Sequence, residues 1–135
     1  ERRGLEGCYD GCDRQALLAL GNAARFSRRW TVAQRALAAV RARFPQAAEA
    51  RDATFWLGVI ASDSGSGAEA AAFFRRYLAD SPRGPYAEQA LGRQLVLARR
   101  QGTSAAVAAP LARAYLERHP SGTYAELARE ILAGR

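Results

Sequence analysis

The sequence predicts an all-α protein built from recurring pairs of helices. Apolar residues recur at intervals of three and four along most of the 135 residues, as they do on the buried face of an amphipathic helix. A sixteen-residue phrase, RRYLADSPRGPYAEQA at 75–90, returns as RAYLERHPSGTYAELA at 113–128 with nine identities. Repetition at a fixed offset, here 38 residues, is typical of helical repeat proteins.

Short breaks rich in Gly, Ser and Pro divide the chain into seven predicted helices. Asp13 is a suitable N-cap for the first of them, and Thr123 with Glu126 has the spacing of a capping box at the last. No segment alternates with a period of two for long enough to predict a strand. The predicted helices cover residues 13–25, 30–44, 47–63, 67–80, 85–101, 104–119 and 123–133.

A Leu-Gly pair followed at a distance by a proline occurs three times. The glycine and the proline are 24 residues apart in the first two blocks and 28 apart in the third, so about one extra helical turn has to be accommodated there. The pairs are Gly21 and Pro45, Gly58 and Pro82, and Gly92 and Pro120. The blocks predict repeats at 13–45, 47–82 and 85–120, a capping helix at 123–133, and an N-terminal arm at 1–12.

These positions resemble the tetratricopeptide repeat family. The family pattern has an apolar residue, Leu-Gly and a small or aromatic residue on the first helix, then Ala, an aromatic, Ala and Pro on the second. The matching residues are Leu17, Leu20, Gly21, Ala24, Ala33, Leu37, Val40 and Pro45 in the first block and Leu57, Gly58, Ala61, Gly65, Ala70, Phe74 and Pro82 in the second. The resemblance implies a right-handed helix-turn-helix solenoid of about three repeats with a C-terminal capping helix, one domain over 13–133.

The family resemblance also implies a function, since such repeats act as protein–protein interaction scaffolds. A peptide or a partner domain is expected on the concave surface lined by the first helix of each pair. Because the expected lining mixes Arg with apolar side chains, an amphipathic or an extended acidic peptide is the expected partner. The lining positions carried over from the family are Leu18, Asn22, Arg25, Phe55, Val59, Arg93, Leu97 and Arg100.

The stretch RFPQAAEARDATFWLG at 43–58 is similar to bacterial cell-envelope members of this family, the periplasmic coordinator of the Tol-Pal system and the outer-membrane assembly lipoproteins. This similarity implies a periplasmic location, with the cytoplasm as the alternative. An extracytoplasmic regulatory domain of the anti-sigma type is a second reading of the same features. The absence of Met and the first residue, Glu1, indicate a piece of a longer chain or a processed product.

Cys8 and Cys12 stand four residues apart in the stretch CYDGC, just before the first predicted helix. A metal site would need two more ligands, which the single His119 far along the chain does not supply. A local disulfide is therefore the favoured interpretation, and two ordinary thiols are the alternative. A disulfide would indicate an oxidising compartment such as the periplasm.

The chain is strongly basic, with 20 Arg, no Lys and 13 acidic residues, for a net charge of +7. Codon usage in a GC-rich genome explains such an Arg and Ala content without a functional demand. A nucleic-acid-binding helical domain is the rival function, but the Arg residues are scattered rather than gathered in a stripe, which disfavours it. The apolar runs are too short to cross a bilayer.

No catalytic motif is present in the sequence. His119 directly precedes Pro120, at a predicted helix end where a positive charge complements the helix dipole. The GSG at 65–67 has no following Lys and reads as a turn between helices rather than as a phosphate loop. The sequence therefore predicts a protein without enzymatic activity, cofactor or metal.

Overall fold

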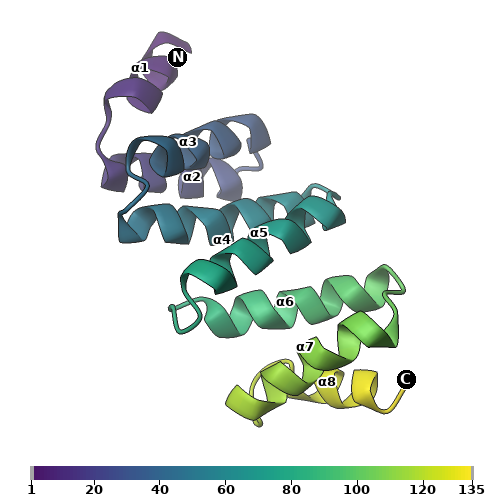
Figure 1. Cartoon of the computed structure of the whole chain (residues 1–135). Coiled ribbons are helices and arrows are strands. Elements are labelled where there is room, and N and C mark those ends of the chain that lie inside the picture. Colours follow the sequence, from purple (N-terminus) through teal and green to yellow (C-terminus); the bar gives the residue numbers. More distant parts are fainter. Residues whose placement is uncertain (1, 135) are drawn as a thin grey trace. The chain divides into compact units, whose positions relative to one another are not determined.

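The computed structural model describes residues 2–134, and over this range the chain is entirely helical, with eight helices and no strand (Figure 1). The prediction of an all-α fold is confirmed. The helices are α1 (Arg2–Gly11), α2 (Arg14–Phe26), α3 (Trp30–Arg43), α4 (Ala48–Asp63), α5 (Gly67–Asp80), α6 (Ala87–Arg100), α7 (Ala105–Arg118) and α8 (Ala125–Leu132).

Each of the seven predicted helices corresponds to one of α2–α8. The structure has one more helix, α1, where the sequence predicted an N-terminal arm. Three glycines in α1 lower its intrinsic helix propensity, which is why the sequence suggests an arm there. Its apolar residues nevertheless recur at helical spacing and pack against the core formed by α2, α3 and α4. These residues are Leu5, Cys8 and Tyr9, and Cys12, which directly follows the helix, packs there as well.

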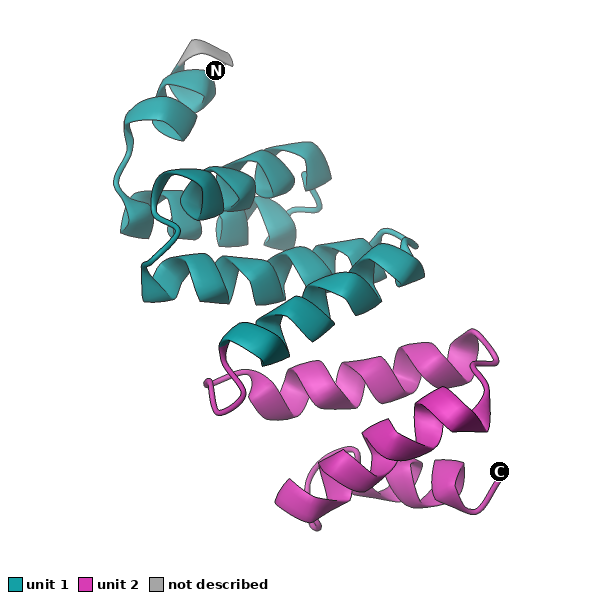
Figure 2. Cartoon of the chain, viewed as in Figure 1, with its two compact units in different colours: residues 1–80 teal, residues 81–135 magenta. Residues whose placement is uncertain are grey.

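The chain divides into two compact units, Glu1–Asp80 and Ser81–Arg135 (Figure 2). The first unit holds α1 to α5 and the second holds α6 to α8. Within the first, successive helices pack as the pairs α2 with α3 and α4 with α5, and α3 also packs on α4. The start of α2 is fixed by its predicted cap, because the Asp13 carboxylate accepts a hydrogen bond of 2.8 Å from the Ala16 amide.

Glycines of the Leu-Gly pairs allow close helix packing in the first unit. A Cβ atom added to Gly21 would lie 2.6 Å from a methyl carbon of Leu37, and one added to Gly58 would lie 2.7 Å from the ring of Phe74. Leu37 and Phe74 are fully buried. The first helix of each pair thus has a gap into which the second helix inserts a large apolar side chain.

The third Leu-Gly pair is used differently in the second unit. A Cβ at Gly92 of α6 would collide with the ring of Tyr124, which directly precedes α8, rather than with a residue of α7. Pro110 lies inside α7 as its sixth residue. In the block with the longer distance from Gly92 to Pro120, the glycine is therefore covered by Tyr124, next to α8, instead of by the second helix of the pair.

Residues of the duplicated phrase form a cluster of hydrogen bonds in the second unit, which we call the polar junction. The hydroxyl of Tyr115 donates a 2.8 Å hydrogen bond to Oε2 of Glu88 and accepts one of 2.9 Å from the Tyr124 amide. The same Glu88 oxygen accepts a 3.2 Å hydrogen bond from the Thr123 amide. The predicted capping box at Thr123 is therefore wrong, because α8 starts after Tyr124 without a side-chain cap and a carboxylate of α6 binds the Thr123 amide instead.

Candidate partner-binding surface

The three predicted lining residues of the first repeat share one face of α2. Leu18, Asn22 and Arg25 are spaced by four and three residues, and all three side chains are half-buried. Leu18 packs against the core of the first unit. The polar ends of Asn22 and Arg25 follow along the same face toward the end of the helix.

Arg25 lies between two aromatic rings. Its guanidinium carbon is 4.5 Å from the ring centroid of Phe26 and 4.3 Å from that of Trp56 on α4. Phe26 is 78% exposed, which is unusual for a large apolar side chain in a folded protein. A cation stacked between two rings holds both in place, because the quadrupole of each ring attracts the positive charge.

Asn22 carries an unsatisfied polar atom. Its Oδ1 is buried and accepts no hydrogen bond from any residue that the structure describes. A buried acceptor without a donor is costly, and such an atom in a native protein calls for an explanation. Because the oxygen is buried, a partner cannot reach it in this conformation.

The prediction that Phe55 lines the partner-binding surface is wrong. Its ring is 0% exposed and lies 5.7 Å from the rings of both Phe74 and Tyr77 on α5. The next residue, Trp56, instead reaches Arg25 of α2. Adjacent residues on a helix point in different directions, and in this doublet the phenyl ring faces the core while the indole faces α2.

The prediction that Val59 and Leu97 line the partner-binding surface is also wrong. Val59 is 3% exposed and Leu97 is 5% exposed, so neither can contact a partner in this conformation. On α6, in the second unit, Arg93 is half-buried and Arg100 is exposed. The Nε of Arg93 is buried and donates to no described residue. The place of these two arginines on a partner-binding surface stays a prediction.

Charged side chains of α2 and α4 meet beside this face. Nε of Arg14 lies 3.2 Å from a carboxylate oxygen of Glu49, which joins the beginnings of the two helices. One turn before Trp56, burial raises the pKa of the Asp52 carboxyl above its ordinary value. The nearby carboxylate of Glu49 raises the pKa further, and the guanidinium of Arg51 opposes the shift.

Cys8 and Cys12 form a disulfide in the structure, across one turn at the end of α1. The same end is held by Arg43 of α3, whose Nη1 donates hydrogen bonds to the carbonyl oxygens of Tyr9 (3.0 Å) and Cys12 (2.8 Å). The guanidinium of Arg35 stacks on the Tyr9 ring at 4.5 Å. Arg43 and Arg35 therefore hold the end of α1 on α3, and the disulfide closes the turn between the two cysteines.

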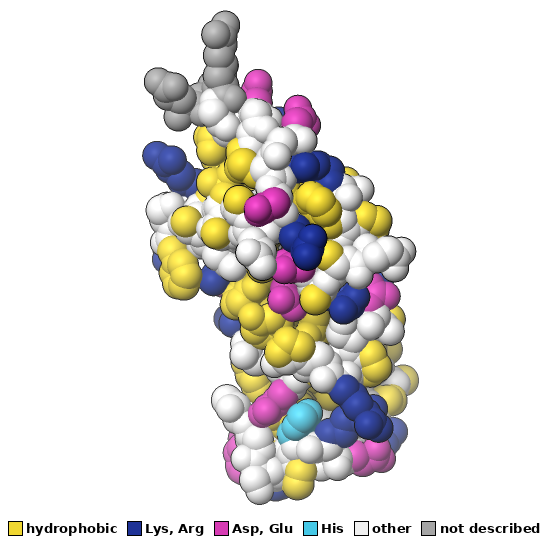
Figure 3. Space-filling view, turned by 90° about the vertical axis from the view of Figure 1, so that its left-hand side faces the viewer, with side chains coloured by type: hydrophobic (Ala, Val, Ile, Leu, Met, Phe, Trp, Pro, Cys, Tyr) yellow, Lys and Arg dark blue, Asp and Glu magenta, His cyan; other side chains and the backbone are white. Residues whose placement is uncertain are grey.

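The described residues form no metal centre, and no continuous basic stripe runs over the face that Figure 3 draws. No group of three or more His, Cys, Asp or Glu side chains is placed to hold a metal ion in residues 2–134. Figure 3 shows acidic and hydrophobic side chains lying among the basic ones in both units, on the face that it draws. No described helix is both long enough and apolar enough to span a bilayer.

The chain has the features of a helical repeat protein. Its helices pack in pairs, a glycine within the first helix of a pair leaves space for a large side chain, and a proline follows the second helix. The family model described as Tetratricopeptide repeat matches residues 18–88, slightly more than half of the chain, and the chain belongs to this family. No curated protein matches the sequence. Tetratricopeptide repeats are generally non-catalytic modules for protein–protein interaction.

Proposed function

We propose that this chain binds a peptide or a partner domain through the exposed side of α2 and the adjoining part of α4. We call this area the α2–α4 surface. Its residues are Leu18, Asn22, Arg25, Phe26 and Trp56. The observation that carries the proposal is the stack of Arg25 between the rings of Phe26 and Trp56, with one ring largely open to solvent.

The residue types on the α2–α4 surface are those that dominate binding energy at protein interfaces. Trp and Arg are enriched among residues whose truncation costs a complex most of its affinity. The stack limits the rotamers of Phe26 and Arg25 before any partner arrives, so less conformational entropy is lost on binding. An exposed phenyl ring then supplies apolar area that a partner can cover.

The partner that fits this surface is an amphipathic peptide segment with an acidic side chain. The apolar part would cover Phe26, and a carboxylate would approach the guanidinium of Arg25. The net charge of +7 would favour encounter with an acidic partner over a basic one.

The proposed setting is the bacterial cell envelope, with the protein in the periplasm. The Cys8–Cys12 disulfide supports this, because such bonds persist in oxidising compartments. The similarity of the 43–58 stretch to envelope members of the family supports it from the sequence side. The cytoplasm remains the alternative location, and intact protein labelled by a thiol reagent in its native compartment would favour it.

A capture and mapping experiment tests the proposal. The wild-type chain and the variants Phe26→Ala and Arg25→Gln are used to capture partners from an envelope extract, and the partner is then purified and its footprint mapped by hydrogen exchange. Val107→Ala is the matched control, because Val107 is also an exposed apolar side chain but lies on α7.

We expect Phe26→Ala to weaken binding by about 2 kcal/mol, which is roughly a thirtyfold loss of affinity. Arg25→Gln should slow association and reduce its dependence on salt. Protection should fall on α2 and α4. Protection confined to α3 and α5, or equal effects of Phe26→Ala and Val107→Ala, would contradict the α2–α4 surface. Salt-dependent binding to a random oligonucleotide, with no protein captured, would favour the nucleic-acid alternative.

A further inference from the structure

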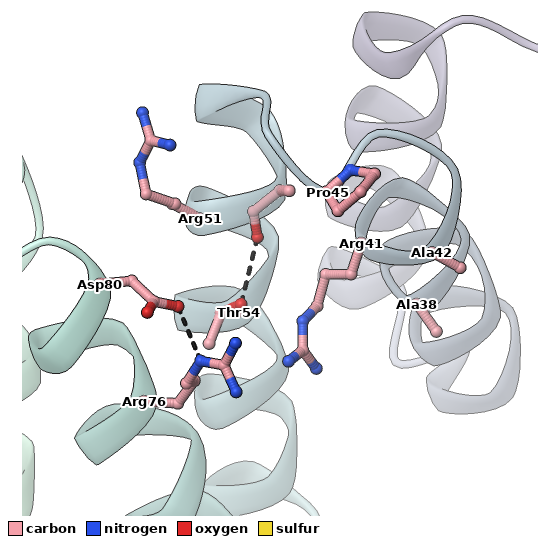
Figure 4. A pocket seen from close by; sticks show the side chains of 9 residues that line it. Ala38, Arg41, Ala42, Pro45, Arg51, Thr54, Arg76 and Asp80 are labelled. Carbon is pink, nitrogen blue, oxygen red and sulfur yellow. Dashed lines mark hydrogen bonds and ion pairs between the residues drawn. The ribbon is translucent and has the colours of Figure 1, made fainter.

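A pocket in the first unit is lined by three arginines from three helices. It has a volume of about 320 Å³ and lies where the end of α3, the first half of α4 and the end of α5 meet (Figure 4). Arg41, Arg51 and Arg76 supply its charge, together with a single acidic residue, Asp80. We call it the arginine pocket. Its remaining lining residues are Ala38, Ala42, Pro45, Ala50 and Thr54.

The charges of the arginine pocket are not balanced. Nε of Arg76 pairs with Oδ2 of Asp80 at 2.8 Å, which accounts for the one carboxylate in the lining. Arg41 and Arg51 form no ion pair with any residue of the described chain. Two positive charges therefore remain in excess around the pocket.

The surroundings of Arg41 disfavour its positive charge. Its guanidinium is partly buried, which lowers its pKa, and the nearby charge of Arg76 lowers it further, while Asp80 opposes the shift. The ring of Phe73, with its centroid 5.6 Å from the guanidinium carbon, helps to fix the side chain in this place. Figure 4 shows the guanidinium groups of Arg41 and Arg76 directed into the same space beside Thr54, with Arg51 directed away from them.

The donors in this space are the two guanidinium groups. The Thr54 hydroxyl donates its proton to the Ala50 carbonyl at 3.1 Å, so it is not available as a donor to a ligand. Two converging guanidinium groups match the geometry of a carboxylate or a phosphate, whose oxygens accept paired hydrogen bonds. An anion there would also relieve the repulsion between Arg41 and Arg76.

We propose that the arginine pocket binds an organic oxyanion, a carboxylate or phosphate group carried on an apolar stem. The guanidinium groups of Arg41 and Arg76 hold the anion. The stem lies along the alanine side chains and Pro45, because the pocket is larger than the bare anion requires and its other walls are largely apolar. This site uses α3 and α5, which the α2–α4 surface does not, so the two proposals stand or fall separately.

Titration of the isotope-labelled whole chain, followed by two-dimensional NMR at constant ionic strength, tests the proposal. The probes are acetate, inorganic phosphate, hexanoate and the uncharged hexanamide. The variants are Arg41→Gln and Arg76→Gln, and Arg75→Gln is the matched control. Arg75 is an exposed neighbour of Arg76 on the same helix, outside the pocket, so its replacement removes the same charge.

We expect saturable shifts of amides near Arg41, Thr54 and Arg76 with the anions. Hexanoate should bind at least about fivefold more tightly than acetate, because part of its chain is buried. Arg41→Gln and Arg76→Gln should each weaken hexanoate binding by about tenfold or more, as expected for a hydrogen bond between charged groups, and Arg75→Gln should not. Tighter binding of phosphate than of acetate would identify a phosphoryl ligand, and the reverse order a carboxylate.

Three results would overturn the arginine pocket as an anion site. The first is an absence of saturable shifts with every anion. The second is an equal loss in Arg75→Gln, which would show a general effect of net charge. The third is binding of hexanamide as strong as that of hexanoate, which would show an apolar cleft only. Because Arg41→Gln and Arg76→Gln change different helices, a variant that fails to fold leaves the other to decide.

Discussion

The ring of Phe74 fills the space that a side chain at position 58 would need. A Cβ atom added to Gly58 would lie 2.7 Å from Cε1 of Phe74, and the ring is fully buried. We therefore expect Phe74→Ala to lower the free energy of unfolding by about 3 to 5 kcal/mol, since it leaves a cavity between α4 and α5. Gly58→Leu should cost about 1 to 3 kcal/mol or more through overpacking. Urea denaturation of the variants measures both.

Phe26→Ala is the control for this pair, because it removes the same ring from an exposed position. We expect it to change stability by no more than about 0.5 kcal/mol. Midpoints for Phe74→Ala and Gly58→Leu that equal that of the wild-type chain would contradict the packing of the central helix pair.

Helix positions could be predicted because their signals are local. The N-cap at Asp13, the prolines after the second helices and the apolar spacing each act within a few residues, and α2–α8 follow them closely. The helix α1 could not be predicted in this way, because its glycines disfavour a helix and its stability comes from packing on α3. A contact between distant segments outweighed local propensity there.

The binding residues were less predictable for a physical reason. Helical spacing places Phe55 and Trp56 on different sides of α4, but it does not say which side meets α5 and which meets α2. The arginine pocket combines residues between Ala38 and Asp80 from three helices, and no local pattern joins them. Such sites depend on the packing of helices and appear only when the helices are placed.

The Tyr115 hydroxyl connects three elements of the second unit, and we expect Tyr115→Phe to destabilise that unit. The change leaves the Tyr124 amide without its acceptor and removes one donor to Glu88. The expected cost is about 1 to 3 kcal/mol. The Tyr115 hydroxyl is a neutral donor around pH 7, since the ordinary pKa of tyrosine lies well above that pH and burial raises it further. Faster hydrogen exchange of the α8 amides would report the loss.

Tyr124→Phe is the matched control for Tyr115→Phe. It removes one hydroxyl from a neighbouring tyrosine whose ring contacts remain, namely the approach to Gly92 and the edge contact with Tyr115 at 6.0 Å between centroids. We expect a change below about 0.5 kcal/mol. Equal exchange rates in the two variants would show that the junction contributes nothing specific.

Reduction of the Cys8–Cys12 disulfide should loosen α1 without unfolding the first unit. The closed loop is very short, so the bond removes little entropy from the unfolded chain, and its loss should cost about 2 kcal/mol at most. The hydrogen bonds from Arg43 to the end of α1 remain after reduction. Protein exported to an oxidising compartment should be lighter by two hydrogen atoms than its reduced form in an intact-mass measurement.

Arg43→Gln separates the contribution of the Arg43 hydrogen bonds from that of the disulfide. If the disulfide and Arg43 both hold the helix, the variant under reducing conditions should show faster hydrogen exchange in α1 than either change alone. Complete thiol labelling of the native exported protein would count against the bond itself.

The Asp52 carboxyl should make stability depend on pH. Its pKa in the folded chain is raised above the ordinary value of 3.8 by burial and by Glu49. A raised folded-state pKa means that the proton binds more tightly to the folded chain than to the unfolded chain. The stabilisation is therefore complete below 3.8 and is lost as the pH rises through the folded-state pKa. At pH 7 the ionised side chain disfavours folding.

We accordingly expect Asp52→Asn to raise the melting temperature at pH 7 and to have a vanishing effect well below pH 3.8. The gain should stay below about 1 kcal/mol, because solvent screens a half-buried carboxylate on the protein surface. Thermal melts of both chains across this pH range measure the difference, and Asp10→Asn, an exposed site on α1, controls for the loss of one negative charge. A lower melting temperature for Asp52→Asn at pH 7 would show that the Arg51 charge outweighs burial at this position. A gain that persists unchanged in acid would show that it does not arise from ionisation of Asp52.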